Sequence, residues 1–92
     1  MKKSLAGKMF QVQLGSPAKR FLKKAQKEVY DRIVKKIKEL AVDPFPPDAK
    51  RVVGRKEKVF RVRVGDYRVQ YVVFFKDRAI LISDIDKRER AY

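Results

Sequence analysis

The sequence predicts a small α+β domain in which a helical segment covers a sheet, and three observations favour it. Apolar and polar residues alternate on both sides of Gly65-Asp66, which is the period of half-buried strands. Residues 18–42 repeat their apolar positions at the spacing of an amphipathic helix. A further strand-like run covers residues 78–85, after the second alternating segment. The predicted order is β-α-α-β-β-β within a single domain of residues 1–92.

The first predicted strand covers residues 8–14, which place Phe10, Val12 and Leu14 on one face. Gly15 ends this strand. Ser16 and Pro17 then predict a helix start, with the serine as N-cap and the proline at the first helical position.

Residues 18–42 are long for a single helix in so small a domain. A helical hairpin that breaks near residues 26–28 would cover a sheet more compactly, so two helices are predicted. Its lysines and arginines lie opposite the apolar stripe and indicate a solvated helix face. Prolines at positions 44, 46 and 47 end the helical part, because proline cannot continue a helix. Residues 49–53 then lead into the sheet, and residues 54–58 form a basic loop.

Gly-Asp between two alternating runs predicts a β-hairpin with a two-residue loop. Such a loop sets the register, and one face becomes apolar: Val64 opposite Tyr67, Val62 opposite Val69, and Phe60 opposite Tyr71. The other face pairs Arg63 with Arg68 and Arg61 with Gln70. Like charges directly opposite each other destabilise a sheet. The pairing therefore has two interpretations, an anion site of converging guanidinium groups or a solvated strand face.

After the hairpin, Lys76-Asp77 predicts a second tight turn, followed by a strand over residues 78–85. Ile80, Leu81 and Ile82 are apolar on both faces, which predicts an interior strand. The register of this strand stays open, since a slip of one residue exchanges its faces.

The amino-acid composition limits the kinds of binding partner and the side chains available for catalysis. Twenty-five Lys and Arg against eleven Asp and Glu give a net charge of +14 and a pI near 10.3, so a polyanion, most simply nucleic acid, is expected. An anionic membrane surface is the competing partner, but the chain has no long apolar run. No cysteine or histidine occurs, so catalysis would use Lys, Arg, Tyr, Asp or Glu. No secretory signal is evident, and a cytoplasmic location is expected.

The assembled sequence resembles the RelE/ParE superfamily of toxin–antitoxin toxins, nearest to the RelE branch. The resemblance is carried by residues 16–19, the helical stretch to Asp43-Pro44, residues 50–54 (similar to a Lys-x-Leu-x-Gly element), residues 60–71 and the terminal Arg88-x-x-x-Tyr92. It implies a twisted, mainly antiparallel sheet with two helices packed on one face. It also implies a ribosome-dependent endoribonuclease that cuts mRNA in the ribosomal A site, and a RelB-type antitoxin that inhibits it.

The resemblance places catalytic and RNA-contacting groups on the open sheet face at Arg61, Arg63, Arg68, Arg88 and Tyr92, three of which the hairpin register also selects. It implies attack of the ribose 2′-OH on the adjacent phosphate. Arg63 and Arg68 would stabilise the phosphorane, with Arg88 as a further clamp. Tyr92 could act as the base, stack on an RNA base, or plug the end of the sheet.

Further basic residues are predicted to bind RNA: Lys50, Arg55, Lys56, Lys58 and Arg90. The acidic residues Glu57, Asp66, Asp77, Asp84 and Asp86 form no metal-ligand or paired-carboxylate motif, so no metal and no cofactor are predicted. Two rival functions remain, a ParE-like inhibitor of DNA gyrase and a non-catalytic basic binder of RNA or ribosomes.

Overall fold

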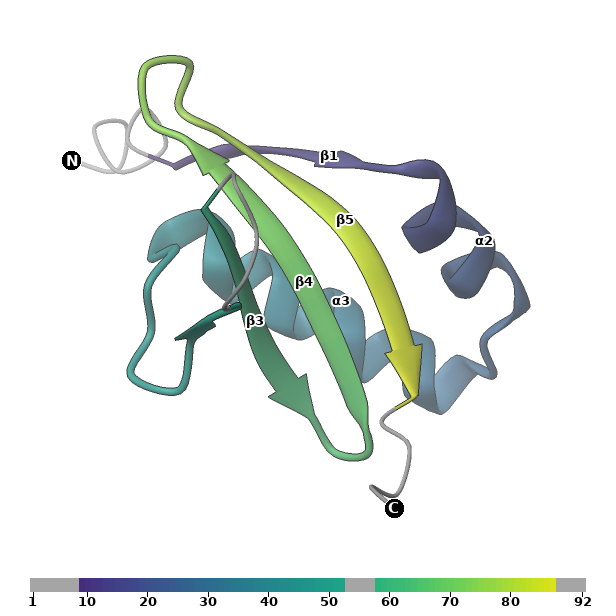
Figure 1. Cartoon of the computed structure of the whole chain (residues 1–92). Coiled ribbons are helices and arrows are strands. Elements are labelled where there is room, and N and C mark those ends of the chain that lie inside the picture. The colour runs from purple at the N-terminus through teal and green to yellow at the C-terminus, as the bar shows by residue number, and fades with distance from the viewer. Residues whose placement is uncertain (1–8, 53–57, 88–92) are drawn as a thin grey trace, which may run out of the picture.

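The computed structural model describes residues 9–52 and 58–87, which form one five-stranded sheet with two helices on a single side of it (Figure 1). The elements are β1 (Gln11–Leu14), α2 (Ser16–Lys24), α3 (Lys27–Val42), β2 (Lys50–Arg51), β3 (Val59–Val64), β4 (Tyr67–Phe74) and β5 (Ala79–Lys87). The spatial order is β1-β5-β4-β3-β2, with β1 parallel to β5 and the other neighbours antiparallel. The predicted α+β class and mainly antiparallel sheet are confirmed.

The helical segment breaks where α2 gives way to α3. Ala25 and Gln26 both have extended backbones, with ψ of 146° and 154°. The predicted hairpin of two helices is confirmed, with its break at residues 25–26.

The predicted start of the first helix is wrong by one residue. Gly15, not Ser16, is the N-cap of α2, and no side chain caps the helix there. The N–H of Gly15 donates to the carbonyl of Ile82 at 2.9 Å, while its own carbonyl accepts from the N–H of Lys19 at 3.0 Å. The sheet therefore holds Gly15 at the end of β1, and helical hydrogen bonding begins from it.

The core lies between the helices and one face of the sheet. Ile33 and Leu40 of α3 are fully buried there, as are Val69 and Tyr71 of β4 and Ile80 and Ile82 of β5. Tyr67 is half-buried and packs edge-on against Phe21, with 5.5 Å between ring centroids. The apolar face predicted for the hairpin is thus the core face.

The β3–β4 register matches the prediction at every pair from Phe60–Tyr71 to Val64–Tyr67. Gly65 has a φ of +61°, a left-handed conformation that glycine adopts without strain. A Cβ at this position would also lie 2.9 Å from Nη2 of Arg32, which reaches the turn from α3. The backbone conformation therefore favours glycine here, whereas the Arg32 guanidinium ends a flexible side chain and could move away from an added Cβ.

The second turn is longer than predicted. It spans residues 75–78, and β5 begins at Ala79 rather than at residue 78. Arg78 itself takes the left-handed conformation, with φ of 48°, and its guanidinium lies 5.0 Å from the ring centroid of Phe10. This cation–π contact holds the Arg78 side chain over the residue that precedes β1 and offsets part of the backbone strain.

A bulge interrupts the pairing of β4 with β5. Gln70 lies opposite Asp84, but the next residue, Tyr71, lies opposite Ile82, which leaves Ser83 without a partner. The Ser83 hydroxyl donates to the carbonyl of Gln70 at 3.3 Å. The prediction of an interior strand is confirmed, since β5 lies between β1 and β4 with Leu81 on the face opposite Ile80 and Ile82.

Among the described residues, neither helix has the length and apolar character needed to cross a membrane.

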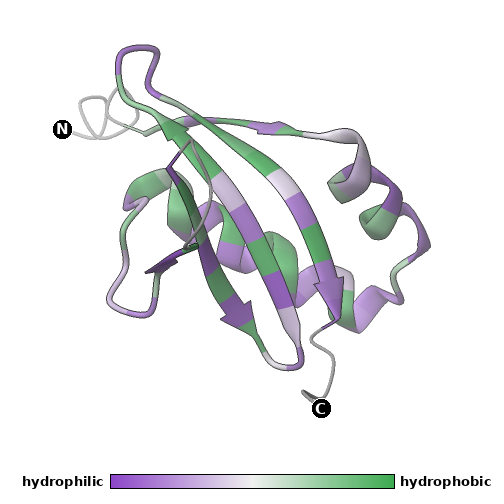
Figure 2. Cartoon of the chain, in the orientation of Figure 1, coloured by the Kyte–Doolittle hydropathy of each residue, from purple (hydrophilic) through white to green (hydrophobic). Residues whose placement is uncertain are grey.

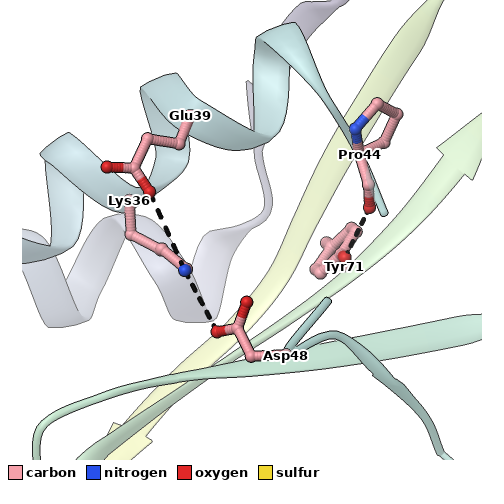
Figure 3. Close-up of polar contacts among 5 residues, drawn as sticks. All are labelled: Lys36, Glu39, Pro44, Asp48 and Tyr71. Carbon is pink, nitrogen blue, oxygen red and sulfur yellow. Dashed lines mark hydrogen bonds and ion pairs between the residues drawn. The ribbon is translucent and has the colours of Figure 1, made fainter. Parts of the chain in front are cut away.

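Tyr71 links the sheet to the segment that follows α3. Its hydroxyl donates a 2.6 Å hydrogen bond to the carbonyl of Pro44, drawn in Figure 3. The ring is fully buried, so the hydroxyl depends on this one acceptor for its hydrogen bond. Tyr71 therefore orients the proline-containing segment against the core.

We predict that Tyr71→Phe lowers the free energy of unfolding by about 1–2 kcal/mol, because the Pro44 carbonyl loses its buried donor. Urea denaturation measures the change. Tyr30→Phe is the control, since Tyr30 is 43% exposed and should tolerate the loss of its hydroxyl. Equal losses in the two variants would contradict the assignment.

Stability should also depend on Tyr71 at alkaline pH. Burial, with smaller effects of Asp48 and Asp43, raises the pKa of Tyr71 above its ordinary range. Its contribution is therefore complete below the unfolded-state pKa of about 10 and decreases as pH rises further. Unfolding midpoints measured from about pH 9 to 11 should fall more steeply for the wild type than for Tyr71→Phe. Parallel curves would contradict this expectation.

Candidate nucleic-acid interface

The face of the sheet away from the helices carries the predicted arginines. Arg61 and Arg63 alternate along β3, and Arg68 on β4 lies directly opposite Arg63. Lys50 on β2 lies opposite Arg61, and register partners project to the same face. These four residues are called the basic face below. Figure 1 views the sheet from this side, with α3 passing behind the strands and α2 to the right of β5.

The basic face occupies only the hairpin end of the sheet. Toward the other end, the same face carries the apolar row Val59, Val72 and Leu81, and Val59 is 1% exposed. Figure 2 shows this division: hydrophobic residues dominate β4 and β5 near the β4–β5 turn, and hydrophilic bands alternate toward the β3–β4 turn. The positive charge is thus concentrated rather than spread along the strands.

A hollow of about 280 Å³ opens beside β3, lined by Asp48, Lys50, Arg61, Val62 and Arg63. Three of its five lining residues are cations of the basic face. A group the size of a nucleotide phosphate fits a hollow of this volume, and guanidinium groups bind phosphate oxygens with two parallel N–H donors.

One lining residue, Asp48, is an anion that forms an ion pair with Lys36 of α3. The Lys36 ammonium lies 3.1 Å from the Asp48 carboxylate and 3.8 Å from that of Glu39 (Figure 3). The hydrogen bond from Lys36 holds the pKa of Asp48 below its usual range. Asp48 is therefore ionised at neutral pH and already engaged by Lys36.

Arg68 contacts the carboxylate of Asp86, to which the sequence alone assigns no role. Asp86 on β5 lies opposite Arg68, with 3.4 Å between Nε of the arginine and Oδ1 of the aspartate. Both atoms are shielded from solvent, and within the described residues neither makes a hydrogen bond. The contact is an ion pair without hydrogen-bond geometry.

Asp84 lies on the same strand and face, opposite Gln70. Two cross-strand rows result, Arg63–Arg68–Asp86 and Arg61–Gln70–Asp84. The sequence offers only the spacing of Ile82 and Ile85, three positions apart; the structure buries both, which an unbroken strand does not allow. That spacing requires a bulge, and the bulge turns both aspartates to the open face.

The remaining predicted residues divide into two groups. Lys58 is described and exposed, immediately before β3. Arg55, Lys56, Arg88, Arg90 and Tyr92 lie outside the described residues. Within the described ranges, no three acidic side chains come together as a metal-ion site.

Comparison with known proteins identifies the class. The family model described as the ParE toxin of type II toxin–antitoxin systems matches residues 12–92. The RelE1 protein of Methanocaldococcus jannaschii is 48% identical over 66 residues, 64% of this chain and 72% of that protein.

Solved structures agree with these sequence matches. The archaeal RelE–RelB complex of Pyrococcus horikoshii gives a TM-score of 0.78 at 30% identity, over 90% of this chain and 99% of the matched one. The isolated RelE toxin of E. coli gives 0.76 at 19% identity, over 89% and 87% of the two chains, and shares the fold. The protein thus has the architecture and the sequence of a type II toxin. The chain belongs to the RelE/ParE superfamily of toxin–antitoxin toxins, on its RelE branch.

We predict that Arg63→Gln weakens RNA binding while leaving the fold intact or slightly more stable. Removing one charge of the Arg63–Arg68 pair relieves a repulsion of about 0.2–1 kcal/mol. The slope of log affinity against log salt should fall in magnitude by about 0.7–1 for single-stranded RNA. Affinity measured across a salt series, with urea denaturation, tests both effects.

The matched control is Lys35→Gln, which removes one exposed positive charge from α3. A change in salt slope as large in Lys35→Gln as in Arg63→Gln would show that net charge alone governs binding.

Proposed function

We propose that this protein is a ribosome-dependent endoribonuclease that cleaves mRNA in the ribosomal A site. The observation that carries the proposal is the register pairing of Arg63 with Arg68, beside Arg61, on the side of the sheet that the helices leave uncovered. Membership of the RelE branch supports the same reading.

The reaction would use the 2′-OH of the RNA as nucleophile on the adjacent phosphate. The bond to the 5′ oxygen of the next nucleotide then breaks, leaving a cyclic phosphate and a free 5′-OH. Negative charge accumulates on the phosphorane between these events. Arg63 and Arg68 would stabilise it, since guanidinium groups remain charged at neutral pH and their planar donors match phosphate oxygens.

No metal is needed in this scheme, because the guanidinium groups supply the positive charge and the RNA supplies its own nucleophile. We assign Tyr92 as the base that takes the 2′-OH proton and, once protonated, returns it to the leaving 5′ oxygen. Arg88 would be a further clamp on the phosphate, and both residues lie outside the described residues. The ribosome would hold the message in line for attack, which supplies rate through positioning.

A RelB-type antitoxin would be the inhibitory partner. The matched structure from Pyrococcus horikoshii is a complex of RelE with RelB. A chain of net charge +14 offers strong attraction to an acidic antitoxin segment, and occupation of the basic face would exclude RNA. Toxin, antitoxin and ribosome would meet in the cytoplasm.

Inhibition of DNA gyrase is the second candidate function, favoured by the match to the ParE family model over residues 12–92. A gyrase poison has no need of arginines paired across two strands. Loss of supercoiling activity with translation untouched would establish this alternative.

Toeprinting on translating ribosomes tests the proposal. The wild-type protein should create new message ends in the A site, and Arg68→Gln should slow their appearance by about 10²–10³-fold, the usual cost of removing one oxyanion donor. Lys35→Gln is the charge-matched control and should retain activity. Absence of new ends with the wild type would exclude the enzyme assignment, and RNA binding that survives in Arg68→Gln without any cleavage by the wild type would favour a non-catalytic binder.

A further inference from the structure

Arg68 is the middle member of a cross-strand row that carries charges of both signs. Arg63 on β3 lies on one side of it and Asp86 on β5 on the other. The side chain of Arg68 is 32% exposed and that of Asp86 is 43% exposed, so both are partly withdrawn from water. Arg63 is more exposed than Arg68. Arg68 is thus repelled from one side and attracted from the other.

The ion pair uses one particular edge of the guanidinium. Asp86 Oδ1 lies 3.4 Å from Nε, and both atoms are shielded from solvent. Coulombic attraction is stronger in such surroundings than in bulk water. The distance is longer than a hydrogen bond of about 2.7–3.2 Å, so the carboxylate attracts the guanidinium without taking up one of its N–H donors.

The opposite edge of the guanidinium carries the two Nη nitrogens. These hold four of its five N–H donors and can bind two phosphate oxygens in parallel. A carboxylate beside Nε therefore leaves the Nη nitrogens available, and its Coulombic attraction favours guanidinium orientations that keep Nε beside Asp86. An unrestrained arginine beside Arg63 would instead turn away from the like charge.

We propose that Asp86 is a positioning residue for RNA cleavage, holding Arg68 by its Nε edge so that its Nη edge faces the scissile phosphate. This inference rests on the proposed function of the basic face. It assigns a role to a β5 carboxylate that sequence alone does not connect with the arginines.

Asp84 provides a matched control within the same strand. It lies on the same face, two positions earlier, but opposite Gln70 instead of an arginine. Asp84→Asn and Asp86→Asn remove the same charge at neighbouring places. Each variant should therefore bind RNA as tightly as the wild type or slightly more tightly, because a negative charge near the phosphate is lost. Only Asp86→Asn removes the restraint on Arg68.

Single-turnover cleavage on programmed ribosomes separates binding from chemistry. Asp84→Asn should keep the maximal cleavage rate within about twofold, whereas Asp86→Asn should lower it by about tenfold or more, the effect expected when a catalytic group is misplaced. The toxin concentration for half-maximal rate should not increase in either variant. Asp86→Glu, which keeps the carboxylate, should recover part of the rate. Equal rates for Asp84→Asn and Asp86→Asn would overturn the proposal.

A double-mutant comparison tests whether Asp86 acts through Arg68. In an Arg68→Gln background, Asp86→Asn should have almost no further effect on the cleavage rate, because the group that it positions is gone. Slowing by the same factor in both backgrounds would show that Asp86 acts independently of Arg68, and the positioning role would be wrong.

Nuclear magnetic resonance of the arginine Nε–Hε group gives a readout apart from cleavage. The Arg68 signal should move in Asp86→Asn and stay in place in Asp84→Asn, and titration with inorganic phosphate should perturb it in the wild type. A signal that ignores Asp86→Asn would contradict the pairing itself. If the signal behaves as expected while wild-type protein never cuts message, the proposed function fails and the pairing stands.

Discussion

The two-residue loop at Gly65-Asp66 is the constraint on which the architecture of the basic face depends. Its left-handed glycine sets the β3–β4 register, and that register sends every second side chain to the core. Val62, Val69 and Tyr71 are buried as a result, and Arg61, Arg63 and Arg68 share the opposite side. A slip by one residue would bury arginines beneath α3 and expose the valines. Burial of the apolar side thus supplies the free energy that keeps two like charges face to face.

A second constraint acts on β5. Ile80 and Ile82 must face the helices, and Ile85 must do so too, although an uninterrupted strand would turn it outward. The unpaired Ser83 resolves this conflict by shifting the register after Ile82. Without the shift, Asp84 would lie opposite Val69 on the core face and Ile85 would lie opposite Arg68. The register shift that buries Ile85 therefore also places Asp86 opposite Arg68.

Membership of the RelE branch and the geometry of the hairpin are independent observations. Sequence similarity to RelE proteins rests on the chain as a whole, whereas the convergence of arginines rests on the pairing of two strands. The aspartates of β5 add a feature that similarity alone does not indicate. One of them, Asp86, places a negative charge beside Arg68, which offsets part of the repulsion between Arg63 and Arg68.

The sequence by itself determined both helices, four of the five strands, the hairpin register and the face that carries Arg61, Arg63 and Arg68, because alternation and turn chemistry are local properties of the chain. The predicted β-α-α-β-β-β order lacked the short β2 strand, since two residues carry no alternation and their pairing with β3 is a tertiary contact. The sequence also placed the break between the helices within a residue or two. Only the tertiary structure decided that Gly15 caps α2, that β1 runs parallel to β5, and that Asp86 meets Arg68. Each of these depends on contacts between residues far apart in the chain, where the choice between alternative registers is made by how well the buried side chains pack.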